Sequence, residues 1–463
     1  MSLQKEKRNW GGLIEESKQP SIDGVEITED QTVINNEHYH HHHHHSEYSQ
    51  HHQHHRRHRH RSNSSKRKKN KFVTFLKKHR GVLVNILSCT ISAVLLVVIA
   101  LNIDFLQPSK EENHYLDITQ DTIRIETSIY PKRILMVSDA ISYYMSPDNN
   151  ASANEVYKLF NGYKSTLNVG LPLKFTYYVT GLPSCVKVQS AVLEISENND
   201  YRDALTYRLD LEDSTLDIYN LKTGTNYYYR VNLTLDNAGV IGTTGTFETE
   251  ESPRILNIDG AVNVRDIGGW NTVGGSKIKQ GLLYRGSEID GAVHTKYKIT
   301  DRGLQQMIGE LVIRFDMDLR SSFEIKEGTD ALGKNVIHKY YGVGSYSTLL
   351  DNKVQLRDIF SDLANRDNYP IYLHCTYGRD RTGSVCYLLE ALLGVSDSDL
   401  QKEYEISAFT DSYVSTADFN AFVEKIHSFK CATTQQKVEG YLLSIGVTEE
   451  EIATIREILL EEQ

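Results

Sequence analysis

The sequence predicts two folded domains of different class: an all-β sandwich, followed by an α/β domain with a central, mostly parallel sheet. Beyond residue 253, strand-like runs such as LVIRFDMDLR alternate with helical stretches such as TGSVCYLLEALLG, which is typical of α/β domains. Before that point, short stretches of alternating polar and apolar residues are typical of antiparallel strands. A chain of 463 residues with 39% hydrophobic content can bury both cores.

Residues 1–80 predict a disordered arm, because they are poor in apolar and rich in polar and charged residues. They hold 16 Lys and Arg against 9 Asp and Glu, a charge of +7, so the remaining residues carry −17 of the total of −10. The acidic remainder argues against nucleic-acid binding, which depends on Lys and Arg to neutralise phosphates. The basic arm suits anionic lipid headgroups, at about 1 kcal/mol per basic residue near the surface.

Most histidines lie in this arm, in HYHHHHHHS and HHQHHRRHRHR. Flexible imidazoles can collect around a transition-metal ion, but a His-rich composition alone does not define a metal site. An affinity tag is the alternative, although the histidines continue, interleaved with arginines, as far as His60. None of the five cysteines is spaced as C-x-x-C. We therefore predict no metal site and no cofactor.

An uncharged, mostly apolar run at residues 81–101 is long enough to cross a bilayer core of about 30 Å as a helix. We predict a transmembrane helix over 81–103. A dense Lys/Arg block precedes it and acidic residues follow it, which predicts a cytoplasmic N-terminus. The expected protein is a single-pass plasma-membrane protein with an uncleaved signal anchor and an extracellular C-terminal bulk.

Residues 104–165 are predicted as a poorly defined linker, in which RIETSIY and PKRILMV could form strands. The sandwich is predicted over 166–252. Its clearest strand is YYYRVNLTL, where Tyr229, Val231 and Leu233 fall on one face. The phrase LKTGTNYYYRVNLT, followed by TGTFET, resembles the late strands of fibronectin type III domains. We expect this domain to act as a spacer.

The predicted α/β domain, residues 253–463, contains the loop HCTYGRDRTG at residues 374–383. PIYL precedes the loop as a strand, and a helix follows it, with apolar residues at i, i+3, i+4, i+7 and i+8 from Val385. Ligands of open α/β sheets bind at such strand-to-helix loops. Successive backbone N–H groups and the positive end of the helix dipole form a socket for an anion.

The side chains of the loop fit phosphoryl transfer. Gly378 lets the chain curl tightly, and the planar fork of Arg381 can grip two phosphoryl oxygens. The same positive field favours a thiolate at Cys375 and makes it a nucleophile at neutral pH. Attack on a phosphate ester would give a cysteinyl-phosphate, and Thr382 is placed to stabilise the sulfur when it leaves.

Five blocks, NVRDIGGW, LLYRGSEI, DLRSSFE, HCTYGRDRTG and YLLSIGVTEEEI, occur in the order found in bacterial protein tyrosine phosphatases with a basic-Asp-Arg-Thr-Gly loop. The resemblance spans roughly residues 255–463. It implies that Cys375 is the nucleophile and that Arg381 clamps the phosphate. The other loop residues would bind the substrate phosphate: Thr376, Tyr377, Gly378, Arg379 and Thr382. Arg379 replaces the lysine usual in that family, which leaves the preference among phosphorylated substrates open.

Two carboxyl groups are candidates for the general acid. Asp380 is favoured because the loop guarantees its proximity, whereas Asp318 requires its strand end to face the socket. The alternative for Asp318 is an ordinary ion pair with Arg320. We expect Cys386 in the core and His374 to support the loop by hydrogen bonding. Three further residues, from NVRD, are expected to brace the loop: Asn263, Arg265 and Asp266.

The expected function is hydrolysis of phosphate monoesters on phosphorylated proteins, with phosphoinositides as alternative substrates because of Arg379. A second possibility is a non-catalytic module that captures phosphorylated ligands or mediates adhesion at the cell surface. The segment at residues 403–429 is the predicted lid over the loop. The sequence does not predict an oligomeric state.

Overall fold

The computed structural model describes residues 123–160, 169–212, 214–236, 239–325, 330–410 and 414–462. All of them belong to one compact unit, Lys110–Gln463. The predicted arm and the predicted transmembrane helix over 81–103 lie outside the described residues. Within the described ranges, no helix is both long and apolar enough to cross a membrane.

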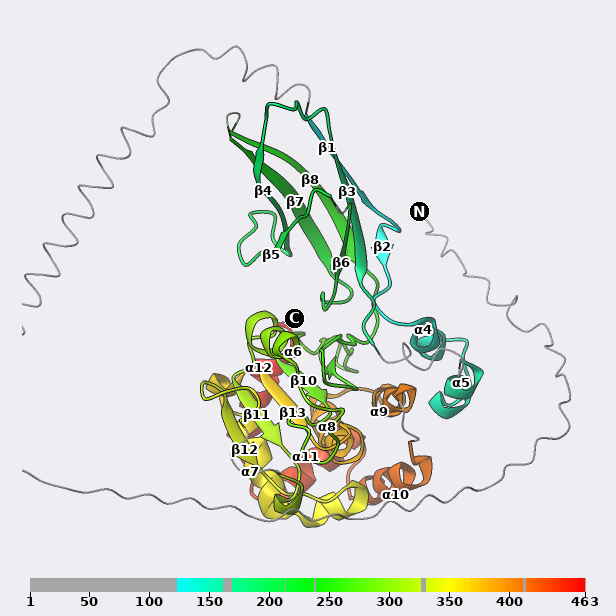
Figure 1. Ribbon diagram of the computed structural model, residues 1–463. Helices are drawn as coiled ribbons and strands as arrows, with labels where there is room; N and C mark the ends of the chain where they lie inside the picture. Colours follow the sequence, from blue (N-terminus) through cyan, green and yellow to red (C-terminus); the bar gives the residue numbers. More distant parts are fainter. Residues whose placement is uncertain are drawn as a thin grey trace, which may run out of the picture. The chain divides into compact units, whose positions relative to one another are not determined.

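Two β-sheets with a common hydrophobic core form the N-terminal part of this unit (Figure 1). One sheet has three antiparallel strands in the order β1 (Arg124–Ile129), β3 (Leu173–Thr180) and β6 (Thr215–Ile218). The second sheet has five strands in the order β2 (Arg133–Ile134), β8 (Gly239–Thr249), β7 (Asn226–Leu235), β4 (Val188–Ser196) and β5 (Leu205–Arg208).

Alternation along the sequence explains how these sheets pack. Every second residue of β7, from Tyr227 to Leu235, is buried, as the predicted period of two requires. Phe175 of β3 meets Tyr229 of β7 in an edge-on aromatic contact, with ring centroids 5.3 Å apart. The two strand-like patches of the predicted linker contain β1 and β2, which pair with strands of the two sheets.

Two short helices, α4 (Asp139–Met145) and α5 (Ala153–Leu159), lie in sequence between β2 and β3. Ser138 caps the first, and a capping box of Ser152 and Glu155 starts the second. Their buried side chains belong to the hydrophobic cluster of the C-terminal part and not to the core of the two β-sheets. The predicted linker therefore contributes packing surface to the α/β domain.

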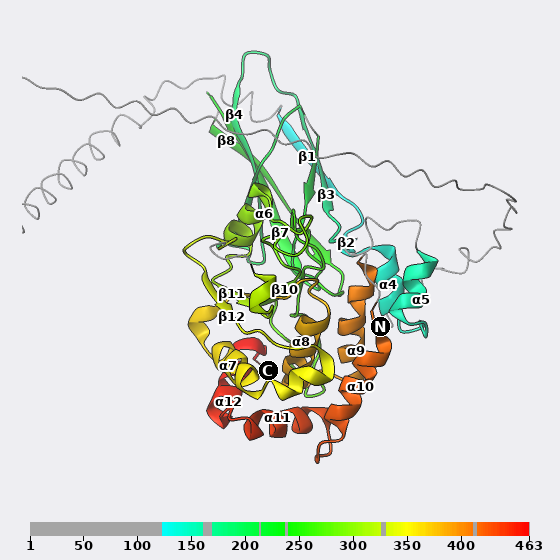
Figure 2. The same cartoon turned by 60° about the horizontal axis from the view of Figure 1, so that its bottom comes forward.

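The α/β domain contains one five-stranded sheet in the order β12 (Ile337–Tyr340), β11 (Phe315–Asp318), β13 (Ile371–His374), β10 (Leu283–Gly286) and β9 (Arg265–Asp266). The first four are parallel, and β9 is antiparallel to β10. The sheet is thus mostly parallel, as predicted. Its helices are α6 (Asp301–Gln305), α7 (Lys353–Leu363), α8 (Asp380–Leu393), α9 (Asp397–Glu405), α10 (Thr416–His427), α11 (Thr434–Ser444) and α12 (Glu449–Leu459) (Figure 2).

Short helical turns complete the α/β domain: η3 (Gln306–Glu310), η4 (Ser322–Glu324), η5 (Tyr346–Asp351), η6 (Arg366–Asn368) and η7 (Ile406–Phe409). The two faces of the sheet pack differently. Met317 and Leu373 belong to the large cluster that includes α7, α8 and α12. Tyr284 and Tyr372 belong to a smaller cluster with Met307 of η3.

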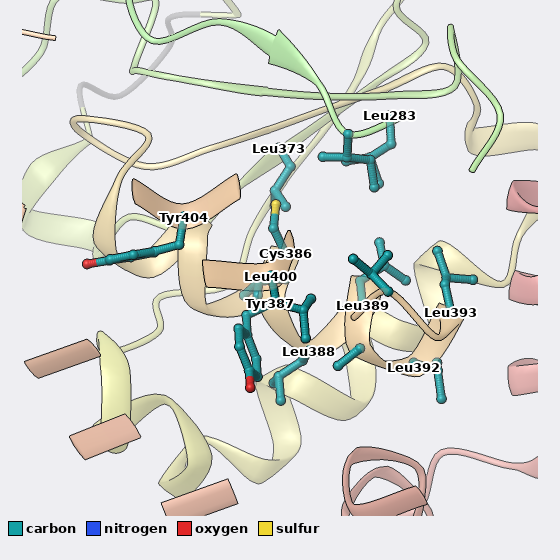
Figure 3. Close-up of a cluster of buried hydrophobic side chains, with 14 of the residues drawn as sticks. Leu283, Leu373, Cys386, Tyr387, Leu388, Leu389, Leu392, Leu393, Leu400 and Tyr404 are labelled. Atoms are coloured by element: carbon teal, nitrogen blue, oxygen red, sulfur yellow. The ribbon is translucent and has the colours of Figure 1, made fainter. Parts of the chain in front are cut away.

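Helix α8 is buried from Thr382 to Leu393, on all sides and not only along the predicted stripe. The buried Cys386 side chain points toward Leu373 of β13 and belongs to the same hydrophobic cluster as Leu283 of β10 and the leucines of α8 (Figure 3). Burial raises the pKa of the Cys386 thiol well above its ordinary value. Cys386 is therefore a core residue, as expected.

Candidate active site

The loop after β13 has the predicted strand-loop-helix setting, because β13 ends at His374 and α8 begins at Asp380. Gly378 adopts a φ of 63°, in the left-handed region. A Cβ atom there would lie 2.2 Å from the carbonyl carbon of Gly286, so only glycine fits this position. The loop backbone at Gly378 therefore packs closely against Gly286, the last residue of β10.

Cys375 is buried within this loop, with 3% of its surface exposed. Burial alone would favour the neutral thiol. The charge of Arg381 and the hydroxyl and N–H groups of Thr382 outweigh burial, so the pKa of Cys375 lies below its ordinary value. Arg381 and Thr382 thus favour the thiolate, the reactive form of cysteine.

Arg381 is held in place by Glu324, a residue that the sequence analysis did not single out. Its Nη1 and Nη2 donate to the two carboxylate oxygens over 2.6 and 2.7 Å, and Nη2 also donates to the Thr376 hydroxyl over 3.0 Å. The Arg381 hydrogen bonds lower the pKa of Glu324 to about 2. Glu324 is the last residue of the DLRSSFE block. A carboxylate close in sequence to an arginine of that block was the signal that could have indicated an ion-pairing function.

The two candidate acids have different surroundings. Asp380 accepts hydrogen bonds from the Tyr346 hydroxyl at 2.5 Å and from Arg379 at 2.8 and 2.9 Å, and its side chain stays 23% exposed. Asp318 is fully buried and pairs with Arg320 at 2.7 Å. Despite its burial, neighbouring positive groups, including His374 and Arg320, hold the pKa of Asp318 far below its usual range.

A carboxyl group with so low a pKa has no proton to donate near neutrality. The structure therefore favours the ion-pair alternative for Asp318 over its candidacy as general acid. Arg320 is the centre of that ion pair and also donates to Glu288 and Asp290, at 2.6 and 2.8 Å. Arg320 thus anchors the end of β11 and does not brace the Cys375 loop directly.

One of the three expected bracing residues contacts the loop directly. The Asn263 amide donates to the carbonyl oxygens of Tyr377 and Gly378 over 3.2 and 3.0 Å. Arg265 donates to the Asn263 side chain over 2.6 Å and to Glu403 over 2.7 Å. Asn263 thus braces the loop as expected, whereas Arg265 acts on it through Asn263 and Glu403.

Asp266 does not contact the loop and instead pairs with Arg254 at 2.8 Å, because β9 turns successive side chains to opposite sides. A bracing residue that the sequence analysis missed is Arg285 of LLYRGS. It is fully buried and donates to the Gly378 carbonyl oxygen over 2.8 Å and to Glu403 over 2.6 Å. Glu403 is the first residue of the predicted lid. It supports the loop indirectly, because it accepts a hydrogen bond from Arg285, which contacts Gly378.

Aromatic rings lie beside the loop. The partly buried ring of Tyr377 lies 4.8 Å from that of His294 and 6.1 Å from that of Tyr297, between centroids. The Arg379 guanidinium lies 5.4 Å from the Tyr377 centroid. His374 places its Nδ1 atom 3.3 Å from the Cys375 carbonyl oxygen, consistent with the expected hydrogen-bonding support.

The sequence of the α/β domain is similar to known phosphatases. Residues 256–461 match the family model described as "Tyrosine phosphatase family". The chain is 23% identical to a tyrosine-protein phosphatase of Nostoc commune, over 34% of this chain and 70% of that protein. Among solved structures, the core catalytic domain of the PP-IP phosphatase SIW14 from S. cerevisiae aligns with 18% identity and a TM-score of 0.25, over 32% of this chain and 83% of that one.

Proposed function

We propose that the chain is a phosphatase that hydrolyses phosphate monoesters of phosphorylated proteins through a cysteinyl-phosphate. The match of residues 256–461 to the tyrosine phosphatase family model and the similarity to a tyrosine-protein phosphatase support this proposal. One observation carries the proposal: the buried Cys375, with its lowered pKa, shares one tight loop with Arg381. A thiolate beside a guanidinium pairs a nucleophile with a clamp for the phosphoryl group.

In the first step the Cys375 sulfur attacks phosphorus, the bond from phosphorus to the ester oxygen breaks, and the leaving oxygen takes a proton from Asp380. Arg381 and the loop N–H groups hold the phosphoryl oxygens. In the second step water attacks phosphorus, the sulfur leaves as thiolate and Asp380 takes a proton from the water. Inorganic phosphate is released, and Thr382 stabilises the departing sulfur.

We assign the general acid to Asp380 and not to Asp318. Asp380 is partly exposed beside the loop, where a substrate oxygen can approach it, and the Tyr346 hydroxyl fixes its side chain. Asp318 is fully buried in its ion pair with Arg320. Accordingly, Asp380→Asn is expected to slow hydrolysis of poor leaving groups more than that of activated aryl phosphates, because only poor leaving groups need the proton.

The decisive experiment measures release of inorganic phosphate from an aryl phosphate by Cys375→Ser and by the matched Cys185→Ser variant. Cys185 is an exposed free cysteine outside the α/β domain. We expect Cys375→Ser to lose hydrolysis and Cys185→Ser to keep it. Full activity in Cys375→Ser would refute the mechanism. Phosphate binding without turnover by the unaltered chain would favour the non-catalytic capture module.

Phosphotyrosine peptides are the substrates we favour, with phosphoinositides second. The aromatic rings of Tyr377, His294 and Tyr297 suit a substrate that presents an aromatic ring. Arg379 supplies charge for more anionic substrates, but its guanidinium already pairs with Asp380. A panel of phosphotyrosine peptides, phosphoserine peptides and phosphoinositides compared by kcat/KM would rank them.

The proposal also covers how the chain is anchored in the membrane, where it is located and what the β-domain does. The apolar run at residues 81–101 and the basic block before it support a single-pass plasma-membrane protein with an extracellular catalytic domain. The three-stranded and five-stranded sheets support a fibronectin type III-like spacer. Accordingly, protease added to intact cells should remove the α/β domain and leave residues 1–80 protected.

A further inference from the structure

A buried cluster of one carboxylate and two imidazoles lies on one face of the central sheet. Asp316 of β11, His338 of β12 and His374 of β13 belong to three adjacent parallel strands. The register pairs Asp316 with His338 and pairs His374 with Asp318, two residues further along β11. Because side chains two residues apart point to the same face, the strand pairing brings all three together.

The ligand-type atoms of these three side chains converge. One atom from each of Asp316, His338 and His374 lies within 4.8 Å of the other two. The His374 Nε2 atom lies 2.9 Å from Asp316 Oδ1, and the His338 Nε2 atom lies 3.8 Å from Asp316 Oδ2. His374 and Asp316 are 1% and 2% exposed. The His338 side chain is 11% exposed, so the cluster is largely shielded from bulk solvent.

Three of these buried atoms lack a hydrogen bond in the part of the chain that the structure describes: Asp316 Oδ1, His338 Nε2 and His374 Nε2. His374 Nε2 and Asp316 Oδ1 are close enough for an ion pair when the ring is protonated. A buried polar atom without a partner is costly, and three at one point are unusual. If His338 and His374 were protonated, each Nε2–H would need a hydrogen-bond acceptor in line with it.

The charge balance of the surroundings also calls for a cation. Besides Asp316, three carboxylates pair with the Arg320 guanidinium: Glu288, Asp290 and Asp318. All four carboxylate side chains are at most 4% exposed. Even with the His374 ring counted as positive, two positive charges face four negative ones in a buried place, where uncompensated charge is expensive.

We propose that Asp316, His338 and His374 bind a divalent transition-metal ion of the Zn²⁺ type. Two imidazoles and one carboxylate are a ligand set of zinc and iron sites, whereas Ca²⁺ and Mg²⁺ prefer oxygen ligands. The ion would accept the unpartnered atoms as ligands and would offset the surplus negative charge. It would also join strands β12, β11 and β13.

The outer contact of His374 fits this assignment. Metal-binding histidines usually donate the other ring N–H to a carbonyl or carboxylate oxygen, which fixes the tautomer. The Nδ1 atom of His374 lies 3.3 Å from the Cys375 carbonyl oxygen, whereas that of His338 lies 3.9 Å from an Asp330 carboxylate oxygen, which is too far for a hydrogen bond. The Nε2 atom of His374 is then left to face the ion. The ion would hold the residue before Cys375 and takes no part in the displacement at phosphorus.

The test uses the full chain with every histidine between residues 38 and 60 changed to Gln, so that the His-rich arm does not bind the probe. Zn²⁺ is titrated into this background and into its His338→Gln, Asp316→Asn and His427→Gln versions. His427 is a matched control because it lies on α10 and its side chain is 40% exposed. We expect one ion per chain in the background and the control, with a saturating rise in melting temperature.

His338→Gln and Asp316→Asn should weaken Zn²⁺ binding at least about tenfold, since each removes a ligand. Absence of stoichiometric Zn²⁺ binding in the background, or equal affinity in His338→Gln and His427→Gln, would overturn the proposal. If both ligand variants fail to fold, Co²⁺ is added instead to the chain that lacks only the histidines of residues 38–60. Visible absorption of a nitrogen-bound, four- or five-coordinate Co²⁺ ion would support the site, and absence of that absorption would refute it. None of these readouts depends on phosphatase activity.

Discussion

At the scale of single residues, Arg381 is held by a carboxylate before any substrate arrives. Its contacts with Glu324 and Thr376 use three of the five guanidinium donors. Two donors remain for phosphoryl oxygens. A flexible arginine would lose entropy on binding phosphate, whereas one already fixed by Glu324 loses less. Glu324 is therefore a positioning residue that acts through Arg381.

Glu324→Gln should lower kcat/KM by about tenfold or more, because a charge-assisted hydrogen bond contributes about 1.5–3 kcal/mol. Steady-state kinetics with an aryl phosphate would measure it. Glu457→Gln is the matched control, since the Glu457 side chain makes an exposed ion pair with Arg366. A Glu324→Gln variant with tighter phosphate binding would show instead that the carboxylate competes with substrate.

The same ion pair has a defined pH dependence. The pKa of Glu324 is lowered to about 2 from an ordinary value of 4.5. Its contribution to stability is therefore complete above pH 4.5 and is lost as the pH falls toward 2. Urea unfolding at several pH values should show a smaller loss over this interval in Glu324→Gln than in the unaltered chain.

Cys375 should react as a thiolate at a lower pH than an ordinary cysteine, and Arg381 is a main cause. We expect the midpoint of its alkylation rate against pH to lie below the ordinary thiol value and to rise in Arg381→Met. Peptide mapping by mass spectrometry, with the exposed Cys185 and Cys431 as internal references, would measure the rates. An unchanged midpoint in Arg381→Met would contradict the electrostatic explanation.

The sequence predicted those site residues that share a local motif and missed those that act across the fold. Cys375, Gly378 and Arg381 are a few positions apart, so their joint chemistry follows from the loop alone. Glu324 and Arg285 reach the same loop from other strands and turns. Asp266 looked equivalent to Arg265 in NVRD, but the alternation of β9 sends it to Arg254.

At the scale of elements, helix α8 is buried on more sides than its apolar stripe predicted. The apolar stripe from Val385 predicted helix α8, but the helix is covered on every side by the sheet and by α9 to α11. A central helix has no solvent face, so polar residues such as Glu390 are also buried in it. Sequence periodicity therefore indicated the helix but not its full burial.

Helices α4 and α5 illustrate the opposite problem, because they pack on a domain that lies far away in sequence. The Tyr144 hydroxyl donates to Glu405 over 2.8 Å, and the Ala153 N–H donates to the same oxygen over 3.2 Å. Ile141 and Val156 join the core of the α/β domain. A short polar segment gives little sign of such a partner, which is why it was predicted as a linker.

Tyr144→Phe should lower the free energy of unfolding by about 1.5–3 kcal/mol, because Glu405 loses a donor in a buried setting. Tyr178→Phe is the control, since Tyr178 is 52% exposed and a surface change usually costs less than about 0.5 kcal/mol. Chemical denaturation of both variants would measure the difference. Equal stabilities would mean that the Tyr144 contact adds nothing.

At the scale of the whole molecule, the β-domain and the α/β domain are joined by buried hydrogen bonds. Arg254 donates to the carbonyl oxygens of Asn220 and Leu221 over 2.6 and 3.2 Å, and its third contact is Asp266. The Gln280 amide donates to the Thr223 carbonyl oxygen over 2.8 Å. Together with the helices between β2 and β3, these contacts make the α/β domain depend on residues before 253.

A chain that begins at residue 253 should therefore be less stable than one that begins at residue 110. It would expose the surface that Ile141, Tyr144 and Val156 cover, and each such side chain contributes about 1.5–3 kcal/mol when buried. Arg254 would keep Asp266 but lose both carbonyl acceptors. Thermal unfolding and binding of a hydrophobic dye would compare the two chains. Equal melting temperatures would show that the α/β domain folds independently of the upstream helices. If a separately added chain of residues 110–252 restored the melting temperature, the missing stability would come from the contact between that segment and the α/β domain.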